Sequence, residues 1–197
     1  MKTRKGLATF KVAKPLSRQN PRRYPLPLRG SWFLRWLYRP AYQPRFTPQA
    51  ILLSYLCSFV GIAVLAYLTV YTGYPLIAAP FGATAVLVFA VPDSPLAQPR
   101  NVVGGCVVGA IVCVACVALF GSAPWVMALA VATAIKVMQL THTLHPPGGA
   151  VALVGVMSHA NWDFIFVPVL SGAILMVVCT AIFGSFIPGR PYPKHWI

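Results

Sequence analysis

The sequence predicts an all-α membrane protein of about six spans, arranged as two inverted three-helix repeats whose second helices are broken. The first observation is composition: the 197-residue chain is 58% hydrophobic and 9% charged, whereas soluble domains are about half apolar and about a quarter charged. Secondly, the apolar residues gather in runs of the length that membrane helices require. Thirdly, two of these runs are interrupted by proline and glycine at matching positions.

Residues 1–47 form a basic, proline-rich arm that we expect on the cytoplasmic side. The chain has 16 Lys and Arg residues, and only Arg100, Lys136, Arg190 and Lys194 lie beyond the arm. A basic segment directly before a membrane helix sets topology and attracts anionic lipid, which we favour over binding to nucleic acid. Aromatic residues and arginines alternate in Ser31–Arg39, which indicates either a short interfacial helix or a disordered tail.

The membrane domain is expected over residues 48–188, followed by a short basic cytoplasmic tail at 189–197. Because arm and tail are both placed inside, the number of crossings must be even, which favours six spans over five. A polar loop is expected at Asp93–Asn101. The expected apolar segments, in chain order, are Gln49–Thr72, the broken segment Tyr74–Pro92, Val102–Phe120, Pro124–His142, the short piece after the His145–Gly149 break, and Phe164–Phe186.

The two broken segments align with each other. When Ala79–Phe89 is placed over His145–Gly155, proline meets proline and glycine meets glycine, and VVGG at 102–105 then meets VLSG at 169–172 with a shift of one residue. Inverted repeats with Gly/Pro-interrupted segments at matching positions predict a transporter-like site near the membrane midplane. The alternative is chance recurrence, because small residues and proline are common in membrane helices.

Proline is well suited to the first turn of a helix, so each break should start a half-helix. We expect one from Pro146 to about Ser158 and one over Phe81–Val91. Both amino termini would point to the midplane, where helix dipoles and free N–H groups favour an anion. The substrate-binding candidates at the breaks are Pro80, Phe81, Gly82, His145, Pro146, Pro147, Gly148 and Gly149.

Other polar residues add positive charge to this prediction. Lys136 lies inside a predicted span, with Gln139 and Thr143 on the same helical face, and we weigh a functional lysine equally against one that snorkels to the headgroups. Arg100 and Asn101 are expected at the cytoplasmic mouth. The two acidic residues of the chain fall in loops, which argues against a cation or proton pump built on a membrane carboxylate. His145 is expected either to couple a proton or to cap the break.

We expect no enzymatic activity, no metal and no cofactor. Cys113-x-x-Cys116 has redox or metal spacing but no second motif, and buried cysteine is usually a packing residue. A metal enzyme using these cysteines with His142 is one rival. The main alternative function is a non-transporting scaffold whose basic arm binds an acidic partner or nucleic acid.

Four segments, PFGATAVLVF, SPLAQPRN, LTHTLHPPGGA and PGRPYP, occur in order and resemble those of the HPP family of integral membrane proteins. The family's His-Pro-Pro signature carries over onto His145–Pro147, and its Pro-Arg-Asn onto Pro99–Asn101, while Gly149 stands where many relatives have alanine. The resemblance implies a small multi-spanning protein. Plant chloroplast relatives are implicated in nitrite transport, so a nitrite-like inorganic anion is the leading expected cargo. We further expect an inner-membrane homo-oligomer in contact with lipid, as a dimer or a trimer and as a carrier or a channel.

Overall fold

The structure, a computed structural model, describes residues 46–73, 78–186 and 191–195. Within these residues it contains α-helices, two π-helical segments, one 3-10 turn and no strand, which confirms the all-helical prediction. The described residues from Pro48 onward form one compact unit, whereas the predicted interfacial helix lies outside the described residues. In chain order the elements are α2 (Pro48–Thr72), α3 (Pro80–Ala85), η1 (Val86–Ala90), η2 (Pro95–Ala97), α4 (Pro99–Phe120), α5 (Pro124–Leu140), α6 (Pro146–Met157), η3 (Ile165–Leu170) and α7 (Ser171–Phe186).

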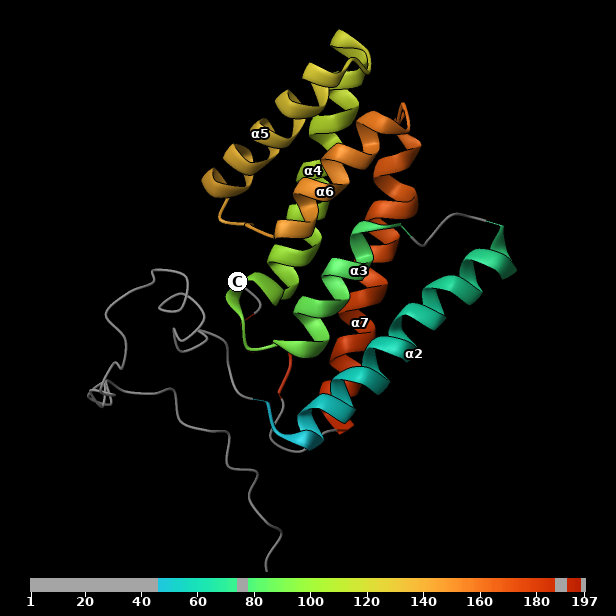
Figure 1. The fold of residues 1–197 in the computed structure, drawn as a ribbon, viewed down its shortest axis with the longest axis vertical. Helices are drawn as coiled ribbons and strands as arrows, with labels where there is room; N and C mark the ends of the chain where they lie inside the picture. The colour runs from blue at the N-terminus through green and yellow to red at the C-terminus, as the bar shows by residue number, and fades with distance from the viewer. Residues whose placement is uncertain (1–45, 74–77, 187–190, 196–197) are drawn as a thin grey trace, which may run out of the picture. The chain divides into compact units, whose positions relative to one another are not determined.

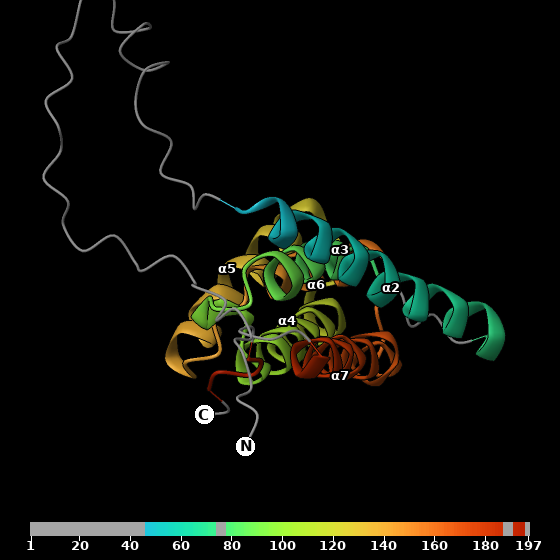
Figure 2. The same cartoon turned by 90° about the horizontal axis from the view of Figure 1, so that it is seen from below.

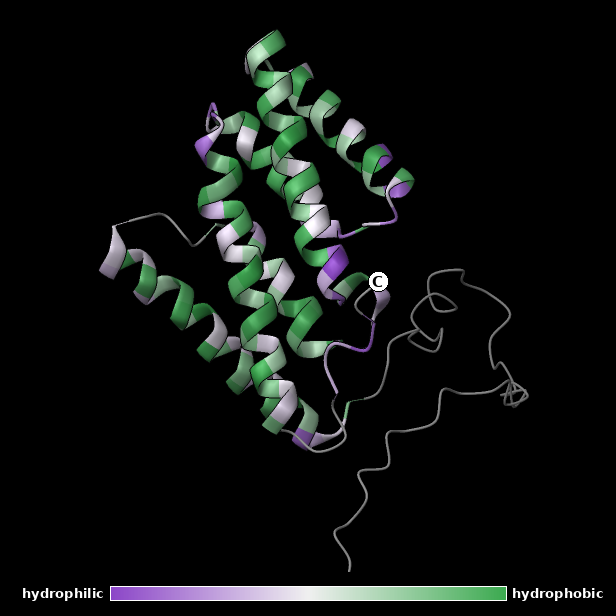
Figure 3. Cartoon of the chain, turned by 180° about the vertical axis from the view of Figure 1, so that it is seen from behind, coloured by the Kyte–Doolittle hydropathy of each residue, from purple (hydrophilic) through white to green (hydrophobic). Residues whose placement is uncertain are grey.

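Three helical segments in the described part of the chain are long and apolar enough to cross a membrane. They are α2, α4, and η3 together with α7. The segments α3–η1, α5 and α6 are apolar but shorter. Hydrophobic residues cover the helices on most sides, and hydrophilic residues gather at helix ends and turns (Figure 3). The chain is therefore built as an integral membrane protein, and the total of six crossings stays a prediction.

Two predicted boundaries are wrong in part. The loop expected at Asp93–Asn101 ends earlier, because α4 begins at Pro99, in the first-turn position that proline favours. Arg100 and Asn101 therefore lie in the first turn of α4. The last span is not continuous, since the backbone of Val167 leaves helical geometry (φ −132°, ψ 116°) directly before Pro168.

The helices form two groups. α5 packs against α4 and α6, while α2 packs against α7 and α3–η1, and the groups meet where α3 contacts α6 and where α4 contacts α7. In Figure 1, α3 and α6 run in opposite directions from similar levels in the middle of the molecule. Seen from below, α4 and α7 lie side by side (Figure 2).

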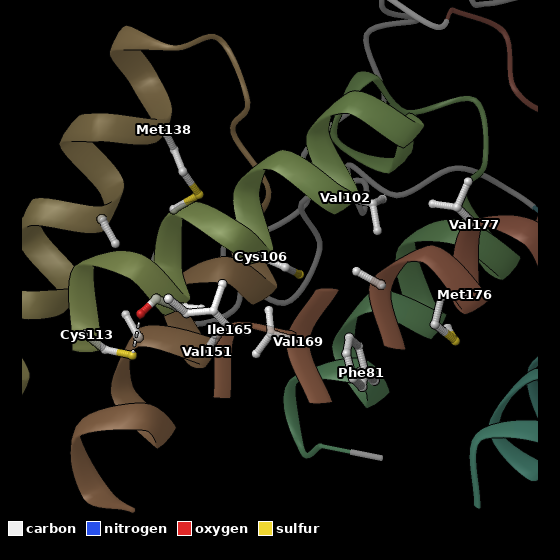
Figure 4. Packing of buried hydrophobic residues seen from close by; sticks show 14 of the residues in the cluster. Phe81, Val102, Cys106, Cys113, Met138, Val151, Ile165, Val169, Met176 and Val177 are labelled. Carbon is white, nitrogen blue, oxygen red and sulfur yellow. Dashed lines mark hydrogen bonds between the residues drawn. The ribbon is translucent and has the colours of Figure 1, made fainter. Parts of the chain in front are cut away.

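α4 and α6 cross in close contact, and glycines of both helices lie at the crossing. A Cβ added to Gly148 would collide with the Gly105 carbonyl, and a Cβ added to Gly109 would collide with the Gly148 carbonyl. Buried side chains from the half-helices and the long helices form one core cluster (Figure 4); among them are Phe81, Val102, Val151, Val169 and Met176. The absence of side chains at the three glycines therefore sets how deeply α6 sits against α4.

We predict that Gly148→Ala lowers the free energy of unfolding by about 1–3 kcal/mol, as overpacking of a tight contact does. The matched control is the adjacent Gly149→Ala, because a Cβ there meets nothing within 4 Å. The control should be neutral or more stable by up to about 1 kcal/mol, from helix propensity. Unfolding followed by circular dichroism in detergent measures both, and equal effects would contradict the close crossing.

Candidate functional site

The segment Thr141–His145 connects α5 to α6 without regular helix. Its backbone includes a left-handed residue, His142, at φ 55°. The Thr143 amide donates to the Met138 carbonyl at 2.9 Å, and the Thr141 and Thr143 hydroxyls lie 2.7 Å apart. The predicted break is thus present, and Pro146 begins the helix that follows it.

Two side chains from the first turn of α4 bind the break. The Asn101 amide nitrogen donates to the Leu144 carbonyl at 2.9 Å, and the Arg100 guanidinium donates to the Thr141 carbonyl at 3.1 Å. Inside a bilayer, carbonyls that leave a helix need such partners because water is scarce. Arg100 and Asn101, which we expected at a cytoplasmic mouth, here supply the donors that an interrupted helix lacks.

His145 is completely buried and links three segments. Its Nδ1 lies 2.9 Å from the Leu96 carbonyl oxygen and its Nε2 lies 3.1 Å from the Thr84 hydroxyl. A carbonyl can only accept, so Nδ1 carries the proton; in the neutral ring, Nε2 then accepts from Thr84. Through this one side chain the start of α6 is bonded both to α3 and to the loop that follows η1.

The other break residues divide into packed and open positions. Pro80, Phe81, Pro147 and Gly148 are buried, while Pro146 is exposed. A Cβ added at Gly82 or Gly149 would meet nothing within 4 Å, so the backbone can be approached there. The first amides are already used: Phe81 and Gly82 donate to the Ala78 and Ala79 carbonyls at 2.9 and 3.1 Å, and Gly148 donates to the His145 carbonyl at 2.8 Å.

The remaining candidates lie near the end of α5, away from the buried histidine. Lys136 and Gln139 are exposed on α5, Arg100 is exposed beside its end, and Thr143 is half-buried against Gly104. The structure therefore brings His145 together with Thr84 and the α4 turn, and leaves Lys136 and Gln139 on the surface. We call the exposed group Arg100, Lys136 and Gln139 the α5-end patch.

Sequence reasoning missed three residues that organise the site. Thr84 had a signal, since it is the single polar side chain of α3. Gln98 lies in the polar loop and is buried, and its amide nitrogen donates to the Pro92 and Ser94 carbonyls at 2.9 and 3.0 Å. The Tyr192 hydroxyl donates to the Ala97 carbonyl at 2.9 Å, and burial raises the pKa of this phenol, so it stays a donor.

The cysteines and histidines of the described residues do not form a metal-ligand cluster. No three His, Cys, Asp or Glu side chains of the described residues come close enough together to hold a metal ion. Cys113 and Cys116 are buried free thiols of α4, while His142 is exposed at the end of α5. The Cys113 thiol donates to the Ala110 carbonyl of its own helix at 3.1 Å.

An open hollow of about 560 Å³ lies at the turn between α6 and η3. Its lining includes His159, Asn161 and Asp163, together with Val167 at the helix interruption. Asn161 and Asp163 bond to each other within the turn, the Asp163 amide donating to the Asn161 side-chain oxygen at 3.1 Å. The hollow is thus separate from the buried histidine and lies at the other end of α6.

Comparison with known proteins agrees with the motifs. A family model described as HPP, transmembrane region, matches residues 43–193. Two similar proteins of Dictyostelium discoideum, each described as a transmembrane protein, are 42% identical over 179 residues and 44% identical over 155 residues. These matches cover 84% and 73% of this chain but 63% and 50% of the relatives, so the chain spans half to under two thirds of their length. No solved structure matches.

We predict that Thr84→Val destabilises the fold by about 1–3 kcal/mol, because it keeps the side-chain shape and leaves the buried Nε2 of His145 without a donor. Thr133→Val, at a half-buried position on α5, is the matched control and should change stability by about 0.5 kcal/mol or less. Thermal unfolding in detergent compares the two variants. A Thr84→Val protein as stable as the control variant would show that the hydroxyl does not serve His145.

Proposed function

The chain belongs to the HPP family of transmembrane proteins, and from this premise we propose that it transports a small inorganic anion across the membrane along a route between α3 and α6. A nitrite-like anion is the leading cargo. The observation that carries the proposal is the buried contact between the two interrupted segments, Thr84 of α3 with His145 at the start of α6.

Interrupted helices inside a bilayer support a transport role. The 12 residues of α6 span about 18 Å, roughly half of the hydrocarbon thickness. Non-helical backbone at membrane depth requires protein or a water-filled cavity around it. A chain that needs only to sit in the membrane would be simpler with continuous helices, whereas paired interrupted helices are how many transporters build a site at the midplane.

The arrangement of the helices supports the inverted repeat that this proposal uses. A half-turn of Figure 1 in the plane of the page brings α5 to the place of α2, α6 to that of α3, and α4 to that of α7. The packing follows the same exchange, since α5 contacts α4 and α6 as α2 contacts α7 and α3–η1. Val102 and Val169, which the sequence alignment pairs, are both completely buried.

The distribution of charge supports an anion as cargo. Asp93 is paired with Lys194 at 2.8 Å in the loop after η1, and Asp163 is exposed at the start of the helical segment that follows the turn after α6, so both acidic residues lie at the ends of helices. The α5-end patch contains two cations, Arg100, which donates to the Thr141 carbonyl of the break, and Lys136, which is exposed on α5; such charges attract an approaching anion and repel a cation. The amino-terminal dipole of α6 has the same sign.

The described conformation is closed along this route. His145 is completely buried, both ring nitrogens are bonded, and the first amides of both half-helices are engaged. Transport therefore requires α3 and α6 to part, with the Thr84–His145 bond broken during the cycle. We place both termini on the cytoplasmic side, following the positive-inside rule.

The test is uptake of nitrite, nitrate, chloride and formate into proteoliposomes that contain the purified protein, with and without a pH gradient. We predict nitrite uptake by the wild type and a loss of at least about tenfold in His145→Ala, because the proposed site loses the imidazole that would contact the anion once α3 and α6 have parted. Lys136→Gln should lower the uptake rate at low anion concentration, since it removes an attracting charge.

Matched variants separate the roles. Lys136→Arg keeps the charge and should restore uptake, while deletion of residues 1–45 should leave it intact. Uptake that disappears with the arm would favour the scaffold alternative, in which the arm binds an acidic partner or nucleic acid. Absence of flux for all four anions in correctly oriented wild-type protein would remove the proposed cargo class.

A further inference from the structure

The loop Pro92–Gln98, which joins η1 to α4, is bonded to the start of α6. Within it, the Ser94 hydroxyl accepts from the Leu96 amide at 3.3 Å, and a single turn, η2, follows. The carbonyl of Leu96 is thereby presented to Nδ1 of His145 at 2.9 Å. Because the loop continues directly from the first half-helix, α3–η1 cannot move away from α6 unless this loop shifts too.

The same loop is held from its other side by the carboxyl-terminal segment Pro191–His195. The Tyr192 hydroxyl donates to the Ala97 carbonyl at 2.9 Å. The backbone amides of Lys194 and His195 donate to Oε1 of Gln98 at 3.0 and 3.2 Å. The Lys194 ammonium also lies 2.8 Å from the Asp93 carboxylate. Loop and segment are separated by more than 90 residues in sequence, so these contacts join the middle of the membrane domain to the segment that follows its last helix.

The buried contacts dominate this attachment. Gln98 uses both of its side-chain amide atoms, with two bonds given to its own loop and two accepted from the carboxyl-terminal segment. Tyr192 is 7% exposed and packs within the apolar core. The ion pair is different: the exposed side-chain fractions of Lys194 and Asp93 are 37% and 54%, and ion pairs that water reaches contribute little.

We propose that Pro191–His195 is a clasp that holds the loop Pro92–Gln98 against His145, and that release of the clasp allows α3 to part from α6. Gln98 and Tyr192 are the positioning residues of this device, and they act on His145 through the Leu96 carbonyl. The inference rests on the proposed function only in identifying that parting with the opening of a transport route.

The opposite end of the molecule supports a one-sided clasp. The turn after α6 occupies the same place in chain order as the loop after η1, since each follows a half-helix and leads into a long helix. Among the residues that the structure describes, no segment comparable to Pro191–His195 lines that turn, and the surface there is hollowed by about 560 Å³. One end of the paired half-helices is therefore clasped and the other is open, as expected of a protein that opens its two sides alternately.

Hydrogen–deuterium exchange of the full chain in lipid nanodiscs tests the clasp without any cargo. Tyr192→Phe and Gln98→Met each remove hydrogen bonds and keep most of the side-chain volume. We predict that exchange of the amides in 81–90 and 141–150 becomes about tenfold faster in both variants, the change that loss of one or two hydrogen bonds implies. Asp93→Asn, which weakens the exposed ion pair, is the matched control and should change these rates less than about twofold.

Two results would overturn the proposal. One is unchanged exchange of both segments in Tyr192→Phe and in Gln98→Met. The other is an equal acceleration in the second half of α4 and in α7, which would indicate general loss of stability rather than release of the half-helices. Anion uptake is measured on the same variants, and faster uptake supports the clasp as part of the transport cycle. If the wild type carries no anion, the proposed function fails, while the exchange experiment still decides whether the clasp holds α3 against α6.

Discussion

The rest of the structure depends on one constraint: a helix that stops inside a bilayer must find new partners for its backbone. Between α5 and α6 the carbonyls of Thr141 and Leu144 are left without helical donors, and Arg100 and Asn101 supply them. These donors exist only because Pro99 starts α4 at the level of the break. α4 must then pass so close to α6 that only glycine fits at their crossing. The interruption between α5 and α6 therefore accounts both for Pro99–Asn101 at the start of α4 and for the glycines of α4.

His145 adds a second level of organisation, because its two ring nitrogens bond to segments that are not neighbours in sequence. Leu96 fixes the tautomer, and Thr84 completes the ring's hydrogen bonding from the other half-helix. Replacing this side chain by an apolar one would leave the Leu96 carbonyl without this donor, whereas the Thr84 hydroxyl still has the Pro80 carbonyl 3.4 Å away; an unpaired carbonyl costs more than the bond itself contributes. The signature histidine therefore has a structural role in the described conformation.

Much of the fold could be predicted from the sequence, because membrane helices are specified locally by apolar length and proline. The start of α6 at Pro146 and its end near Ser158 follow from such signals. The partners of His145 could not be predicted, since Thr84 and Leu96 are 61 and 49 residues away and chain packing alone brings them close. The sequence predicts that Lys136 lies on a helix, and it does lie on α5. A helical wheel does not show which face of that helix other parts of the protein cover, and the structure leaves Lys136 exposed. Gln98 and Tyr192 were missed for the same reason as Thr84: their importance lies in contacts between distant segments.

The chemistry of the contacts separates parts of the molecule that can move from parts that cannot. At Gly105, Gly109 and Gly148 the α4–α6 crossing is backbone against backbone, so we expect these helices and the break bound to α4 to move as one body. By contrast, α3 is joined to α6 by one hydroxyl–imidazole bond, and the loop after η1 is joined to α6 by one carbonyl–imidazole bond. Exchanging one hydrogen bond for a similar one costs little free energy. Separating two closely packed helices costs more, because the packing contacts of both backbones are lost. We therefore expect any opening of the domain to occur between α3 and α6. His145 bonds the start of α6 to α3, and the proposed clasp acts on the same contact through the loop Pro92–Gln98.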